Sequence, residues 1–175
     1  MVSTCCCRTY IFRGKRKSDG EWVYGSLIMA EDYCCILEKE EDVHPIDYPY
    51  LDGDLGWIDG KATPVDPETV GQFTGLLDKD GDPIYEGDIV EFESHGYIPE
   101  TYVGVVIFKD GCYEIEYLPK WYREHGWDSL FHRIGKTEEW RDMGASGTIT
   151  YTYCVLGNKH DNPEFLDMWE ESERR

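Results

Sequence analysis

The chain has 175 residues and a formal net charge of −19, a length that suits one compact unit or two small ones. Its negative field would repel DNA, RNA and anionic membranes, so direct binding to any of them is not expected. Aromatic residues make up 14% of the chain, which excludes a simple acidic disordered tail, because such tails are poor in aromatics. The partners left open are basic proteins, cations and small ligands in a locally favourable pocket.

Strands are expected along most of the chain, because short segments rich in Val, Ile, Tyr and Phe are bounded by Gly, Asp and Pro. The expected strands are residues 9–13, 22–29, 33–38, 87–93, 102–109, 112–117 and 149–156. Two Asp-Gly pairs, at 19–20 and 110–111, favour the positive φ angles that tight hairpins require. A mainly β fold follows.

Two short helical pieces interrupt this pattern. The Asp-Pro-Glu-Thr segment at 66–69 has a cap residue followed by Pro at the first helical position, which predicts one helical turn. The Asn-Pro-Glu segment at 162–164 predicts a short C-terminal helix, whose apolar side begins with Phe165 and Leu166.

Three segments, 44–63, 95–100 and 119–147, are expected to be loops, and a loop as long as the last is typically functional or mobile. Arg can bind phosphate through two hydrogen bonds, Trp and Tyr can stack on a base, and all three are frequent interface anchors. The alternative is that these aromatics pack on the protein and the arginines pair with acids. The candidate ligand- or partner-binding residues in the two long loops are Tyr48, Tyr50, Trp57, Trp121, Tyr122, Arg123, His125, Trp127, His132, Arg133, Lys136, Trp140 and Arg141.

The acidic segment 78–82, Asp-Lys-Asp-Gly-Asp, invites comparison with a calcium loop. An EF-hand requires Gly directly after the third acid, and Pro83 stands there instead. We therefore expect an exposed hairpin loop, with no metal site and no cofactor. The chain also lacks a phosphate-binding glycine loop, a nucleophile elbow and an H-E-x-x-H motif, so no catalytic residues are assigned and enzymatic activity is not expected.

The seven cysteines do not resemble a disulfide framework, since their number is odd and three stand in a run at 5–7. No Cys-x-x-Cys zinc pattern occurs. We expect Cys112 and Cys154 to fill the core of their strands. With neither a signal peptide nor a transmembrane run in the sequence, a cytoplasmic protein is expected.

The middle of the chain carries a longer pattern. Val-Asp-Pro-Glu-Thr-Val-Gly-Gln-Phe-Thr-Gly-Leu-Leu-Asp-Lys-Asp-Gly at 65–81 continues into Ile-Tyr-Glu-Gly-Asp-Ile-Val at 84–90. This block resembles the signature of the YopX family, small proteins of phages and prophages. Phe-Arg-Gly at 12–14, Trp-Val-Tyr-Gly-Ser-Leu at 22–27, Val-Leu-Gly-Asn at 155–158 and Asn-Pro-Glu-Phe-Leu at 162–166 resemble the family's two ends. The sequence departs from the pattern at 44–62 and 119–147.

The resemblance implies a phage-encoded protein acting in the host bacterial cytoplasm. Its expected fold is mainly β, a small SH3-like or YopX-like β-barrel with an N-terminal β element, long inserted loops and a short C-terminal helix. We assign the N-terminal β element with its acidic and aromatic loop to 1–62, and the barrel with the insertion 119–147 to 63–175. The glycines of the block suit tight turns and close backbone approaches, so an architectural role is expected for it.

The sequence leaves three functions from different classes open. The leading one is a non-enzymatic, acidic interaction protein that binds a host protein and inhibits or retunes it, the target being a defence or nucleic-acid-handling factor. The second is a homo-oligomeric sponge that sequesters a phosphate-bearing signalling nucleotide of the host. The third is a hydrolase that uses some set of Asp, Glu and His.

Overall fold

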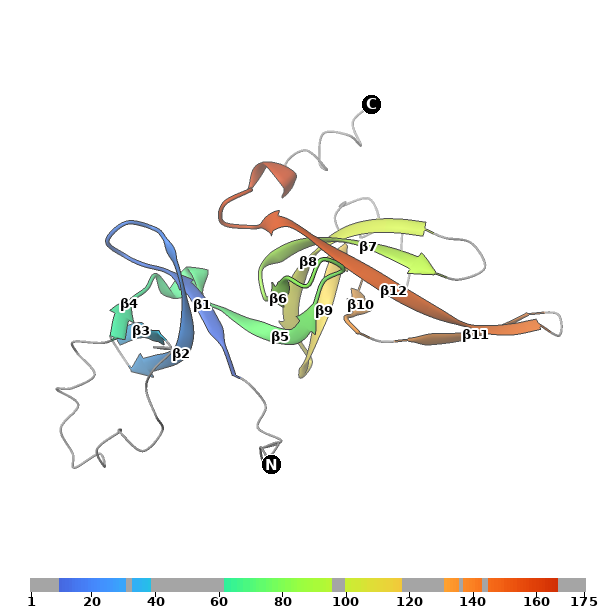
Figure 1. Ribbon diagram of the computed structural model, residues 1–175, viewed down its shortest axis with the longest axis horizontal. Coiled ribbons are helices and arrows are strands. Elements are labelled where there is room, and N and C mark those ends of the chain that lie inside the picture. Colours follow the sequence, from blue (N-terminus) through green and yellow to red (C-terminus); the bar gives the residue numbers. More distant parts are fainter. Residues whose placement is uncertain are drawn as a thin grey trace. The chain divides into compact units, whose positions relative to one another are not determined.

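The computed structural model describes residues 10–30, 33–38, 62–95, 100–117, 131–135, 137–142 and 145–166 (Figure 1). The chain divides into two units, Met1–Phe73 and Thr74–Arg175. The elements are β1 (Phe12–Lys15), β2 (Trp22–Ala30), β3 (Tyr33–Glu38), β4 (Ala62–Pro64), the 3-10 turn η2 (Pro67–Thr69), β5 (Gly71–Leu77), β6 (Pro83–Tyr85), β7 (Asp88–His95), β8 (Glu100–Lys109), β9 (Cys112–Tyr117), β10 (Phe131–Arg133), β11 (Glu138–Asp142) and β12 (Ala145–Asn158). The mainly β fold is confirmed; the exact domain limits stay a prediction.

The described strands form two six-stranded sheets, in the orders β4-β3-β2-β1-β5-β6 and β10-β9-β8-β7-β12-β11. The core of the first unit lies on one face of β2 and β3, where Val23, Cys34 and Ile36 pack with Val65. The expected helical turn is confirmed: Asp66 caps η2 by accepting a hydrogen bond from the backbone N–H of Glu68 at 3.1 Å.

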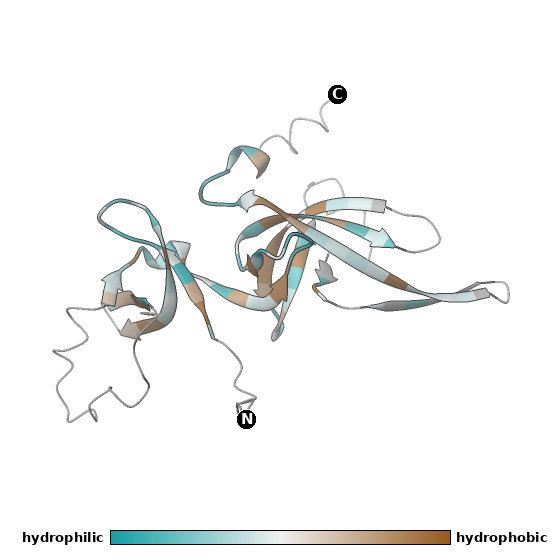
Figure 2. Cartoon of the chain, in the orientation of Figure 1, coloured by the Kyte–Doolittle hydropathy of each residue, from teal (hydrophilic) through white to brown (hydrophobic). Residues whose placement is uncertain are grey.

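The core of the second unit gathers residues from several strands. Val90 and Phe92 of β7 pack with Val106, Ile115 and residues of β6 and β12. The rings of Phe92 and Tyr102 stack with their centroids 5.3 Å apart. Figure 2 shows hydrophobic segments on the strands around this core and hydrophilic ones in the connecting turns.

The second sheet curls. Its order places β10 and β11 at opposite edges, yet only residues 134–137 connect them. The edges of a flat six-stranded sheet would lie about 24 Å apart, whereas the chain from 133 to 138 spans at most about 18 Å. The sheet therefore bends into the half-barrel seen in Figure 1, which agrees with the expected small barrel.

The Asp-Gly hairpin between β8 and β9 is confirmed. Asp110 has φ 50° and Gly111 has φ 83°, and positive values at both central residues define the tight turn that matches the strand twist. At the other Asp-Gly pair, which links β1 and β2, Gly20 has φ 77°.

The expectation that 119–147 is a loop was wrong in part, because β10, β11 and the start of β12 lie within it. The sequence of β11, Glu-Glu-Trp-Arg-Asp, has four charges in five residues and no apolar alternation. Its strand conformation comes from pairing with β12 instead. Three further strands were not predicted: β4 begins inside the expected loop 44–63, β5 contains two glycines, and β6 has only three residues, the first of them a proline.

Candidate partner-binding site

Four carboxylates share one face of the second sheet. On β7, Val90 and Phe92 are buried in the core, so strand alternation directs Glu91 and Glu93 to the other face. On β9, Ile115 is buried in the same core, which directs its neighbours Glu114 and Glu116 likewise. We call Glu91, Glu93, Glu114 and Glu116 the acidic face; Glu93 is exposed and the other three are half-buried.

An apolar stripe on β8 separates the two pairs of acids. Strand register places Val103 opposite Glu91 and Val105 opposite Glu116. Both valines are buried together with Ile89, and Phe165 from the start of the C-terminal helix packs against them. The acidic face is thus two rows of carboxylates on either side of a covered hydrophobic seam.

The helix start that covers this seam is fixed by hydrogen bonds. Asn162 donates its backbone N–H to the carbonyl of Asn158 at 2.9 Å, and its side-chain oxygen accepts from the N–H of Asn158 at 3.2 Å. A Cβ atom on Gly157 would collide with that side-chain oxygen, so any larger residue there would have to displace the side chain of Asn162. The expected C-terminal helix begins as predicted, with Leu166 donating to the carbonyl of Pro163 at 2.9 Å.

The central block of the sequence is architectural. The carboxylate of Asp88, itself only 1% exposed, accepts the N–H of Tyr85 at 2.7 Å. Gly87 adopts φ 84° and donates its N–H to the carbonyl of Val106 at 2.8 Å. Its carbonyl accepts the N–H of Lys159 at 2.9 Å, so the block at 84–90 joins the C-terminal motif at 155–166 through main-chain contacts.

Asp78 ties the turn after β5 to β12. One carboxylate oxygen accepts the N–H groups of Asp80 and Asp82 at 2.8 and 2.9 Å, and the other accepts that of Val155 at 3.1 Å. Burial acts to raise the pKa of Asp78, but these N–H donors outweigh it and the pKa is lowered. The exposed hairpin loop expected at 78–82 is therefore anchored by its first residue.

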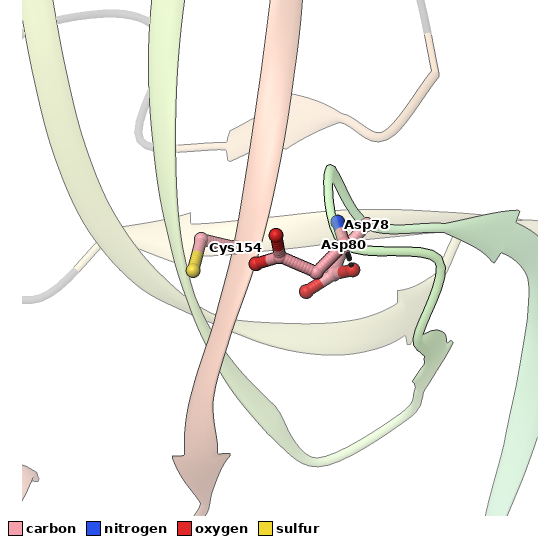
Figure 3. A group of neighbouring side chains, drawn as sticks. All are labelled: Asp78, Asp80 and Cys154. Atoms are coloured by element: carbon pink, nitrogen blue, oxygen red, sulfur yellow. Dashed lines mark hydrogen bonds between the residues drawn. The ribbon is translucent and has the colours of Figure 1, made fainter.

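The same turn brings three potential metal ligands together (Figure 3). Ligand atoms of Asp78, Asp80 and Cys154 lie within 4.8 Å of one another. Lys79 stands beside them: the Cys154 side chain, through charge attraction and a hydrogen bond, and then Asp80 raise the pKa of its ammonium. Because Asp78 already accepts three backbone N–H groups and Lys79 supplies a cation, we assign this group to the structure of the turn.

Cys154 is half-buried, as is Cys112, so the expectation that both fill the core was wrong. Register explains the position of Cys154, since it lies opposite Glu91 and therefore on the acidic face. Of the four described cysteines, Cys34 and Cys35, about which the spacing predicted nothing, are the buried ones. Strand membership alone does not tell which face a residue occupies.

The structure describes few of the predicted binding residues. Within the described part of the chain, β10 carries His132 opposite Ile115 and Arg133 opposite Glu114. On β11, Trp140 lies opposite Gly147 and Arg141 opposite Ser146. The others lie outside the described residues, so a pocket that joins them stays a prediction: Tyr48, Tyr50, Trp57, Trp121, Tyr122, Arg123, His125, Trp127 and Lys136.

The acidic face was not predicted, although the sequence carries a signal for it. Val-Glu-Phe-Glu at 90–93 and Tyr-Glu-Ile-Glu at 113–116 alternate strictly between apolar and acidic residues, which is the pattern of a strand with one polar face. Two such strands in one sheet place their acids on a common face whenever their registers agree. Pairing of both strands with β8 supplies that agreement.

The chain matches one family model and is similar to solved structures. The family model described as YopX protein matches residues 11–167. Among solved structures, the crystal structure of protein EF1440 from Enterococcus faecalis is similar with a TM-score of 0.48 and 21% identity, covering 91% of this chain and 99% of that chain. No curated protein matches the sequence. None of the described helices has the length and hydrophobicity that crossing a membrane requires.

Proposed function

The chain belongs to the YopX family, and from that premise we propose that it is a phage-encoded, non-enzymatic protein that binds a basic surface of a host protein. The target class is a nucleic-acid-handling or defence factor in the bacterial cytoplasm. The observation that carries this proposal is the acidic face, where Glu91 and Glu93 on β7 and Glu114 and Glu116 on β9 flank one seam.

The electrostatics suit a mimic of nucleic acid. A groove that binds DNA or RNA gathers Lys and Arg to neutralise phosphates, and carboxylates arranged on a rigid sheet can occupy the same groove. Residues two apart on one strand stand about 6.6 Å apart. The sheet already fixes this spacing before a partner binds. The net charge of −19 accelerates the approach to a basic partner over its whole surface.

The described part of the site supports binding rather than turnover. Its acids flank a buried apolar seam, and the nearby carboxylate of Asp78 accepts hydrogen bonds from backbone N–H groups of the turn and of β12. Sequestration of a nucleotide by the basic and aromatic residues of 119–141 remains a separate prediction, and no contact among the described residues favours it.

The test is capture of host proteins from a nuclease-treated bacterial lysate, comparing two variants of equal charge. Glu91→Gln/Glu93→Gln removes two acids from the acidic face, and Glu21→Gln/Glu68→Gln removes two exposed acids from the first unit. Each variant has a net charge of −17, since −19 plus 2 is −17. We expect the first to bind the captured protein about threefold to tenfold more weakly and the second to match the wild type. Equal weakening by both would assign binding to overall charge and overturn the acidic face as the site.

A further inference from the structure

We draw no further inference here: the strongest candidate, the cluster of Asp78, Asp80 and Cys154 side chains between the turn after β5 and strand β12, belongs to the structure of the turn already described, and nothing in the described part of the chain points to a ligand that it would bind.

Discussion

At the residue scale, the contacts with the clearest consequences are those of Asp78. Its carboxylate accepts hydrogen bonds from Asp80, Asp82 and Val155 and so connects a turn to a strand that lies far along the sequence. The pattern of residues 78–82 indicates a polar turn, but nothing in it distinguishes the first acid from the others. The bond to Val155 depends on which strand passes beneath the turn, and that is a property of the sheet order.

Replacing Asp78 with Asn is expected to lower the free energy of unfolding by about 1–3 kcal/mol, because the amide retains one acceptor oxygen and presents a donor to the N–H of Val155. Urea unfolding measures the loss. The control is Asp82→Asn, an exposed acid of the same turn, which should change stability by less than about 0.5 kcal/mol. Equal effects of the two substitutions would show that the Val155 contact contributes nothing.

The difference in stability between the wild type and Asp78→Asn is expected to depend on pH. The pKa of Asp78 is lowered from its ordinary value of 3.8, so its charged form stabilises the folded state at pH values above 3.8. This contribution disappears as pH falls through the lowered pKa. The stability difference between wild type and Asp78→Asn should therefore be constant near neutral pH and shrink in acid; a difference that grew in acid would be incompatible with a lowered pKa.

At the element scale, the C-terminal helix start acts as a cover. Phe165 and Leu166 pack on the seam formed by Ile89, Val103 and Val105, between the two rows of the acidic face. Without that cover, a hydrophobic stripe would lie in the middle of the acids.

Phe165→Ala is expected to cost about 2–4 kcal/mol, because it removes packing from three buried residues. Thermal or urea unfolding measures the cost, and binding of a hydrophobic dye reports exposure of the seam. Phe108→Ala serves as the control, since Phe108 is 55% exposed on the same sheet and should lose less than about 1 kcal/mol. A loss at Phe165 as small as that at Phe108 would mean that the helix start does not seal the seam.

The elements that the sequence predicts well are those whose side chains alternate or whose turns need a special backbone. The strands at 33–38 and 112–117 match β3 and β9, and the Asp-Pro-Glu-Thr turn matches η2. The strands it misses are β4, β5, β6, β10 and β11. The pairing of β11 with β12, for example, fixes its conformation, because its own sequence has no strand pattern. The acidic face was not predicted either, because it forms only when β7 and β9 both pair with β8.

At the scale of the whole molecule, the feature that bears most on function is the negative net charge. A net charge of −19 is expected to repel nucleic acid, and the acidic face gives part of that charge a fixed geometry. Membership of the YopX family does not assign a reaction to the chain. Function is therefore expected to depend on which basic surface the carboxylates meet.

The association rate of the protein with its captured host partner, measured from low to high salt, tests binding through the acidic face. We expect the rate to fall by about tenfold or more as salt rises to several times the physiological level, because screening removes the steering field. The fall should be shallower for Glu91→Gln/Glu93→Gln than for Glu21→Gln/Glu68→Gln. An association rate that stays flat with salt, or an equal slope for the two variants, would show that the acidic face does not guide binding.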